Sequence, residues 1–387
     1  MAFDWRRFAE ETRTTVKRTD WTMILAACAL AVIGIIFIWG ASLRRGPTGW
    51  LPLSGYALRQ TLWLGIGLLA MATALFVPYR YLARYGYALY IVGVAALVYV
   101  LLLGPERNFA HRWIALGPIT VQPSEFAKVA FIIALAKFLR YRESYRRWWG
   151  LVVPFGMAAL LMALIAVEPD LGSALVFVPV VFALLYVAGA RKRHLALYAV
   201  VPVAIVLLLW LLGVQFLKSY QSDRLLAFLN PEGHARGAGY NLLQSLGAVC
   251  SGRFWGTGLG QGTQGQLGFL PNRRTDFIFA CIAEEWGFVG VAVILALYVY
   301  LLVSAATIAR RTRDPFGRLL AVGVMTLLAT QALINTGMTV RLGPITGLPL
   351  PFVSLGGSSL VANFIGLGIL LNVGARPTVI LSREDFQ

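Results

Sequence analysis

The chain has 387 residues, of which 58% are hydrophobic and 13% are charged. Soluble domains carry roughly 25% charged residues, so this composition excludes a soluble globular protein and indicates a polytopic membrane protein. The formal net charge of +17 does not indicate nucleic-acid binding, because most Lys and Arg residues fall in short segments between apolar stretches. The few cysteines and histidines are scattered, which gives neither a disulfide framework nor a metal-binding spacing.

Ten stretches are apolar enough to form spans, each of which needs roughly 20 residues to cross the hydrocarbon. The polar first twenty residues do not form a signal peptide, so we expect the first span to remain as an anchor. The fourth span is the weakest, since it contains Glu125, Lys128 and Lys137. The predicted spans are 21–42, 60–79, 85–103, 122–139, 148–167, 171–190, 195–216, 276–306, 319–340 and 356–375.

The predicted fold is therefore all-α, with one ten-helix membrane domain over 21–377. Short basic segments place both termini in the cytoplasm, with 1–20 as an N-terminal segment and 378–387 as a tail. Three long segments then lie on the outer face: 104–124, 217–275 and 341–355. The second of these joins spans seven and eight. Loops longer than about 15 residues are usually functional or disordered, so we expect the working face outside.

A single acid, Asp276, occurs where segment 217–275 re-enters the membrane. An ionisable group there is costly, which favours a functional role, and a carboxylate can act as a general base. The structural alternative is that Thr275 caps the next helix while Asp276 complements the helix dipole. A helix N-terminus would lower the pKa of this carboxylate and burial would raise it, so the sequence leaves the balance open.

Other charged residues lie near the ends of spans. Glu125 and Lys128 share one helical face, either as an ion pair that joins two helices or as a cavity wall where Lys128 reaches a phosphate. The guanidinium of Arg112 also suits phosphate. Glu168 and Asp170 flank the turn between spans five and six, where they would cap a helix, bind a cation or line a cavity.

Two Gly-rich segments follow. The first, 251–268, contains Gln264 and is not a dinucleotide fingerprint, because no strand precedes it. Its glycines favour tight turns and close approach of the backbone to a ligand. The second follows Ser354 and includes Ser358, where small residues either let helices approach or open a helix N-terminus to an anion.

Arg224 and Arg274 belong to the same outer segment, 217–275. They would hold either lipid head groups or an anionic substrate. Within the eighth span, Glu284 is nearer than Glu285 to the helical face of Asp276. The alternative for both glutamates is pairing with a basic group on a neighbouring helix.

Several longer motifs, in this order, resemble the SEDS family (shape, elongation, division and sporulation). The resemblance covers about residues 20–377 and favours the RodA branch over the FtsW branch through GAGYNLLQS and GTQGQLGFLP. Two departures are visible: Asn272, Arg273 and Arg274 replace the family's usual Glu-x-His, and Leu355 replaces a usual Tyr. The matching motifs are QPSEFAKVAFIIALAKFL, AVEPDLGSALV, GAGYNLLQSLGAVCSG, GLGQGTQGQLGFLPNRRTDFIFACIAEEWGFVG and INTGMTVRLGPITGLPLPFVSLGGSSL.

The resemblance implies a glycosyltransferase of the bacterial cytoplasmic membrane that polymerises lipid II during cell elongation. It assigns the essential carboxylate to Asp276. It also implies a class B penicillin-binding protein as partner, within an elongation complex of membrane proteins. No cofactor is required by these residues, and a divalent cation is left open. The residues predicted to contact substrate are Arg112, Glu125, Lys128, Glu168, Asp170, Arg224, Gln264, Arg274, Thr275, Ser354 and Ser358.

Two other functions fit the same membrane architecture. A flippase would move lipid II outward without making polymer, and its buried charges would line the path. A scaffold would only recruit a synthase and would tolerate Asp276→Asn.

Overall fold

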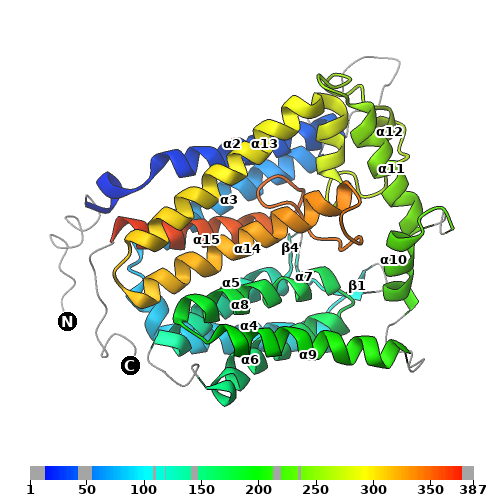
Figure 1. The fold of residues 1–387 in the computed structure, drawn as a ribbon. Helices are drawn as coiled ribbons and strands as arrows, with labels where there is room; N and C mark the ends of the chain where they lie inside the picture. Colours follow the sequence, from blue (N-terminus) through cyan, green and yellow to red (C-terminus); the bar gives the residue numbers. More distant parts are fainter. Residues whose placement is uncertain are drawn as a thin grey trace.

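The computed structural model describes residues 14–41, 55–107, 110–117, 119–140, 147–211, 219–233 and 237–376. Long helices lie side by side in a bundle, and short helices and strand pairs gather at one end of it (Figure 1). The bundle helices are α2 Trp21–Gly40, α3 Gly55–Phe76, α4 Arg80–Leu103, α5 Pro123–Arg140, α6 Val152–Val167, α7 Leu171–Leu175, α8 Phe177–Ala188, α9 Lys192–Leu211, α13 Ile278–Arg311, α14 Pro315–Thr339 and α15 Gly357–Ala375. A 3-10 turn over Trp148–Leu151 precedes α6.

The predicted all-α, polytopic class is confirmed. Within the described residues, eight helical stretches are long and apolar enough to cross a membrane. Each predicted span overlaps a helix, but α5 and α9 are not among those eight, so the count of ten stays a prediction. The end of the seventh predicted span, most of the N-terminal segment and the tail 378–387 lie outside the described residues.

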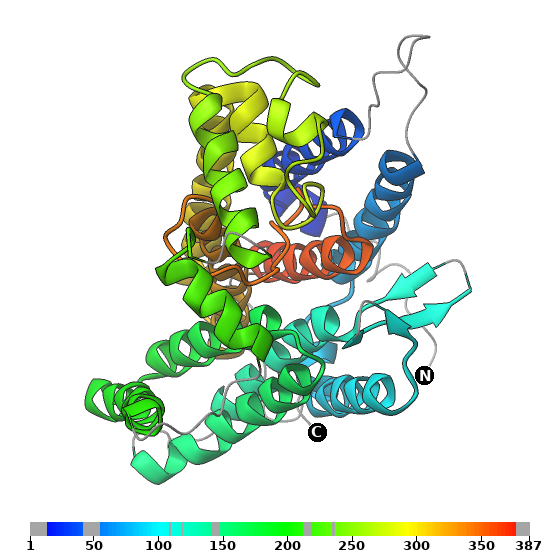
Figure 2. The same ribbon diagram turned by 90° about the vertical axis from the view of Figure 1, so that its right-hand side faces the viewer.

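The end of the bundle that carries the short elements is more structured than the sequence indicated. Segment 217–275 contains α10 Ser219–Leu229, α11 Ala238–Ser251 and α12 Thr263–Gln266. Segment 104–124 forms two antiparallel strand pairs, β1 Glu106–Arg107 with β2 Ala110–His111 and β3 Ile114–Leu116 with β4 Ile119–Val121. Figure 2 looks onto this end, with α10 and α11 (green) crossing it and the strands (cyan) to one side.

Helix α5 occupies the centre of the bundle. It packs against α4, α8, α14 and α15, and nearly all of its residues are buried. One of these contacts is an edge-to-face pair of Phe131 and Phe177, whose ring centroids are 5.2 Å apart. Protein therefore surrounds this helix, which explains how it carries charged residues that a lipid-facing span would not tolerate.

The opposite end of the bundle is fastened by polar contacts. Arg140 at the end of α5 forms an ion pair with Asp314, and Asp314 caps α14 by accepting a hydrogen bond from Gly317 N at 2.9 Å. Asn372 near the end of α15 donates to Ala74 O at 2.7 Å. These contacts hold the ends of α3, α5 and α15 beside the start of α14.

Helix α13 is broken at Gly287, where φ is 63° and ψ is −158°. The Gly-rich segment 251–268 supplies the hydrogen bonds that the break removes: Thr257 N donates to Glu284 O at 3.0 Å and Gly258 N to Glu285 O at 3.0 Å. Phe288 N in turn donates to Arg253 O at 2.9 Å. Irregular backbone inside a membrane protein is tolerated where protein satisfies its polar groups, as it does here.

Candidate active site

Asp276 lies two residues before α13, and the segments α10, α11 and α12 that precede it gather at one end of the bundle (Figure 1). Its backbone is fixed on both sides: its N–H donates to Asn272 O at 3.1 Å, and its carbonyl accepts from Asn335 Nδ2 at 2.9 Å. The side chain is partly exposed, and Oδ2 is 3.7 Å from the position that a Cβ on Gly347 would occupy. The carboxylate is thus held against the segment between α14 and α15 but stays accessible.

The predicted cap at Thr275 is wrong. Helix α13 begins at Ile278 with Phe277 as its N-cap, and no acid lies in the first turn. The Thr275 hydroxyl instead donates to Asn272 O at 3.2 Å. The turn over 272–276 carries the chain past the predicted helix start, so Asp276 precedes the N-cap of α13 and does not lie in its first turn.

Ser354 joins the last outer segment to this turn. Its hydroxyl donates to Thr275 O at 2.5 Å and accepts from Leu350 N at 2.8 Å. Leu355 N donates to Arg274 O at 2.9 Å. Ser354 therefore positions the backbone next to Asp276, and its hydroxyl is already engaged.

Charged groups from distant segments act on Asp276. Burial raises the pKa of this carboxyl, and the neighbouring Asp170 raises it further, whereas the Thr275 hydroxyl, Arg224 and Arg112 lower it. The sequence left this balance open; in the structure, burial is the largest influence. Arg224 donates from α10 to Thr346 O at 3.3 Å, which holds α10 against the segment between α14 and α15.

The turn after α6 ties several of the predicted residues together. Arg112 donates from Nε to Glu168 O at 2.8 Å and from Nη2 to Pro169 O. Asp170 caps α7, as one reading of the sequence predicted, by accepting from Ser173 N at 3.2 Å. Its other oxygen accepts from Gln122 Nε2 at 3.2 Å.

Gln122 extends this network to α15. Its backbone N–H donates to the hydroxyl oxygen of Ser358 at 2.9 Å. Ser358 is buried, so it fastens the start of α5 to the start of α15. The predicted close approach of helices at the small residues is visible beside it, where a Cβ on Gly357 would lie 2.1 Å from Trp63.

Glu168 is a buried acid with unsatisfied oxygens. Its side chain is 1% exposed, and neither carboxylate oxygen has a hydrogen-bond partner among the described residues. Burial is the main cause that raises the pKa of Glu168 to about 8; the neighbouring Asp170 contributes to the rise, and Arg112 opposes it. A neutral carboxyl at physiological pH follows from that environment.

Glu168→Gln tests this protonation state. Because the folded-state pKa is about 8 against 4.5 for a free carboxyl, the folded protein binds the proton more tightly, and its stability falls as pH rises between those values. We expect Glu168→Gln to gain stability over wild type as pH rises from 5 to 8, by at most about 1.4 kcal/mol per pH unit. Melting temperatures of the two proteins across that range measure it; parallel curves would contradict it.

The pair Glu125 and Lys128 is an ion pair inside α5. The Lys128 Nζ to Glu125 Oε1 distance is 2.7 Å, and both side chains are 2% exposed. Of the two predicted roles, the structural ion pair therefore describes this contact best. The pair lies within one helix, however, and does not join two helices. In this arrangement Lys128 is buried and turned to Glu125, so it offers no surface to a phosphate.

The Gly-rich segment is held by two acids of α13. Glu284 accepts from Gln264 N at 2.8 Å and from Gly265 N at 3.1 Å, and Glu285 accepts from Gly260 N at 3.0 Å. The alternative that these glutamates pair with basic groups is therefore not the arrangement in the structure, where their partners are backbone N–H groups. The side-chain oxygen of Gln264 is buried without a hydrogen-bond partner among the described residues.

The side chain of Arg274 contacts the ends of other helices. It donates to Ala41 O at 3.2 Å and lies over the ring of Tyr56, 4.5 Å from the centroid. This arginine links the site's backbone to the ends of α2 and α3. The predicted substrate contact at Arg274 would therefore need a different rotamer.

Sequence reasoning missed two amides that build the site, Asn335 and Gln122. Asn335 is fully buried and bridges Asp276 O and Leu348 O, the latter at 2.7 Å. A buried amide such as Asn335 within the apolar helix α14 is a recognisable signal, because burying it without partners is costly. No group of three or more His, Cys, Asp or Glu residues in the described part of the chain is arranged to hold a metal ion.

Comparison with known proteins identifies relatives along nearly the whole chain. A family model described as a cell cycle protein, covering FtsW, RodA and SpoVE, matches residues 20–378. Stage V sporulation protein E of Bacillus subtilis is 36% identical over 93% of this chain and 98% of its own length. Peptidoglycan glycosyltransferase MrdB of Escherichia coli K12 is 34% identical over 92% of this chain and 95% of its own.

A solved structure has the same fold. A chain from the study titled "Structural coordination of polymerization and crosslinking by a peptidoglycan synthase complex" superposes with a TM-score of 0.78. Its sequence is 32% identical, and the match covers 93% of this chain and 98% of that one.

The long apolar helices and the ionisable groups at one end of the bundle define a polytopic membrane protein with a polar site at that end of its helices. More narrowly, the chain belongs to the FtsW, RodA and SpoVE family, called SEDS in the sequence analysis. The predicted resemblance is thereby confirmed.

Proposed function

We propose that this chain polymerises lipid II into glycan strands, with Asp276 as the general base. The peptidoglycan glycosyltransferase activity follows from the family and from the relative that carries this name. The observation that carries the role of Asp276 is its environment: a partly exposed carboxylate with a pKa raised by burial, under the influence of Arg224 and Arg112. A pKa nearer neutrality suits a general base.

The reaction needs one proton acceptor and a charge partner for the leaving group. The 4-hydroxyl of the acceptor sugar gives its proton to Asp276 as its oxygen attacks the anomeric carbon of the donor. The bond to undecaprenyl diphosphate breaks with its electron pair on the phosphate oxygen, and the configuration inverts from α to β. Arg112 and Arg224, which both act on the charge of Asp276, would supply positive charge to the diphosphate as it leaves from the face of the anomeric carbon opposite to the attacking oxygen.

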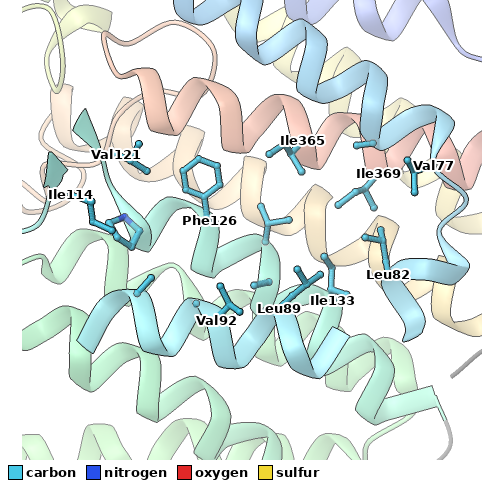
Figure 3. A pocket seen from close by; sticks show the side chains of 16 residues that line it. Val77, Leu82, Leu89, Val92, Ile114, Val121, Phe126, Ile133, Ile365 and Ile369 are labelled. Carbon is cyan, nitrogen blue, oxygen red and sulfur yellow. The ribbon is translucent and has the colours of Figure 1, made fainter. Parts of the chain in front are cut away.

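An apolar cavity beside the site fits the prenyl chain of such a substrate. It has a volume of about 390 Å³ and lies between α4, α5 and α15. Figure 3 shows side chains of these three helices directed into it, Ile365 and Ile369 from α15 and Val92 and Leu89 from α4 among them. Its lining is made of aliphatic and aromatic side chains together with Gly93 and Pro123. Burial of a hydrocarbon chain is the interaction that such a lining favours.

One end of the cavity reaches the polar network of the site. Val121 and Pro123 line it, and Gln122 between them bonds Asp170, which acts on Asp276. A lipid-linked sugar with its tail in the cavity would therefore carry its diphosphate past Gln122 toward Arg112. This continuity favours a lipid-linked substrate over a soluble sugar nucleotide.

Filling the cavity should separate tail binding from chemistry. We expect Ala130→Phe, which places a ring among the lining residues, to raise the KM for long-chain lipid II about tenfold or more, with a small change for a short-chain analogue. Ala159→Phe on the exposed face of α6 is the matched control. Equal effects of Ala130→Phe on both substrates would contradict the tail assignment.

A polymerisation assay with purified protein and lipid II separates the three candidate functions. Glycan strands support the polymerase. Translocation of lipid II in liposomes without polymer would support the flippase, and neither activity would support the scaffold. EDTA added to the same assay tests the expectation that no cofactor is required, because a divalent cation in the mechanism would make polymerisation sensitive to chelation.

The finer assignments are part of the same proposal. We place ten spans in the cytoplasmic membrane, both termini inside and the Asp276 end outside, since the short basic segments favour that orientation. A class B penicillin-binding protein in an elongation complex is the proposed partner. The elongation role rests on the motifs GAGYNLLQS and GTQGQLGFLP, because the sporulation relative is as similar as MrdB.

A further inference from the structure

A second cavity lies at the bundle end opposite Asp276. Its volume is about 390 Å³, and it is formed where the start of α2 meets the last turns of α13 and α15. The proposed topology puts this end in the cytoplasm. Nothing in the glycosyltransferase reaction uses it. Its lining residues are Arg18, Asp20, Val303, Ser304, Thr307, Ile308, Arg311, Thr312, Leu371 and Gly374.

Two arginines give the cavity its charge. Arg18 comes from the short helix over 14–18 and Arg311 from the last turn of α13. Both are exposed, and neither has a hydrogen-bond or ion-pair partner within the described residues. Asp20 is the one acid of the lining, and its carboxylate caps α2 by accepting from Met23 N at 3.3 Å. The positive charges therefore outnumber the negative one.

The hydroxyl groups of the lining differ in what they can offer an anion. Thr307 and Thr312 donate to carbonyls of their own helix, Val303 O at 2.9 Å and Ile308 O at 2.7 Å. Ser304 has no partner among the described residues, so its hydroxyl hydrogen is available. The two guanidinium groups and this hydroxyl are the donors that a phosphate needs.

The residues around the cavity indicate the source of that phosphate. Trp21 at the start of α2 is 53% exposed, as expected for an aromatic residue at the membrane interface. On the membrane side, the wall is apolar and includes Val303, which is 59% exposed, together with Leu371. Basic residues beside an apolar wall at this level match a phospholipid, with its head group on the arginines and an acyl chain along the wall.

We propose that this cavity binds the head group of an anionic phospholipid of the inner leaflet. The lipid phosphate lies between Arg18 and Arg311 and accepts a hydrogen bond from Ser304. Bound there, the lipid fastens the start of α2 to the last turns of α13 and α15.

Native mass spectrometry of the purified full chain tests the site, with phosphatidylglycerol as the probe and phosphatidylcholine of the same acyl chains as the neutral comparison. We expect R18Q/R311Q to weaken phosphatidylglycerol binding by roughly thirtyfold, because each basic residue near an anionic lipid surface strengthens binding by about fivefold. The control R310Q/R313Q removes the same charge from exposed arginines that do not line the cavity. The control is matched for the helix dipole as well, because Arg310 and Arg311 both lie in the last turn of α13.

If both double variants weakened phosphatidylglycerol binding equally, the effect would come from diffuse surface charge and the proposal would be overturned. Unchanged binding in both variants would overturn it as well. Equal binding of phosphatidylcholine, or full displacement of the lipid by millimolar inorganic phosphate, would overturn the assignment to an anionic lipid. If R18Q/R311Q does not fold, Ser304→Asp places a negative charge inside the cavity with both arginines kept. Loss of phosphatidylglycerol binding in that variant supports the site, and unchanged binding overturns it.

Discussion

Asp276→Asn is expected to lower the rate of glycan polymerisation by about 10²- to 10⁴-fold, the usual contribution of a general base. The amide keeps the shape of the side chain but cannot accept the proton of the attacking hydroxyl. Asn335 and Asn272 hold the backbone at this position, and the substitution leaves both of those contacts in place. The melting temperature should therefore stay at or above the wild-type value, while gel electrophoresis of the polymerisation reaction should show the loss of glycan strands.

A matched control is available on α10. Asp223 is an exposed acid beside Arg224, so Asp223→Asn makes the same chemical change at the same end of the molecule without touching the proposed base. We expect near wild-type polymerisation from it. Asp276→Asn that polymerised as fast as Asp223→Asn would remove Asp276 from the mechanism.

The pH dependence of the wild-type reaction follows from the same carboxyl. Only the deprotonated form accepts a proton, and burial raises its pKa above the ordinary 3.8. Activity should therefore fall as pH drops through this raised value, at a higher pH than an exposed Asp would give. The residual activity of Asp276→Asn should lack that acidic limb.

The sequence alone was sufficient to locate Asp276, because a single acid at the edge of an apolar span is costly and stands out. Its surroundings could not be predicted in the same way. Asn335 and Gln122 reach the site only because α14 and the start of α5 pack beside it, and no local pattern records that packing. The helix start was misplaced because the turn over 272–276 depends on contacts with the segment before α15.

The helical class was equally clear from the length of the apolar stretches, whereas the role of the charged residues within them was not. One of the two interpretations had Lys128 offer its amine to a phosphate, whereas in the structure Lys128 pairs with Glu125 and α4, α8, α14 and α15 enclose α5. Pairing with basic side chains was one alternative for Glu284 and Glu285, and in the structure they accept hydrogen bonds from backbone N–H groups of the Gly-rich segment. Each of these outcomes depends on which segment covers a helix face, which is a tertiary property.

Gly287→Ala is expected to destabilise the protein by about 3 kcal/mol or more, and activity should fall with stability. The φ of 63° and ψ of −158° at this residue belong to a region that is essentially restricted to glycine. An added Cβ would also lie 2.4 Å from Gly256 N and 2.7 Å from Phe254 O, both backbone atoms that no rotamer change can move. Thermal melting in detergent measures the loss.

Gly247→Ala is the control for that substitution, since it lies within α11 and its Cβ would meet nothing within 4 Å. Alanine is the better helix former there, so its melting temperature should equal or exceed that of wild type. If Gly287→Ala had the same melting temperature as Gly247→Ala, α13 would be able to straighten at Gly287. The carbonyls of Glu284 and Glu285 would then return to the helix, and the Gly-rich segment would lose its hold on α13.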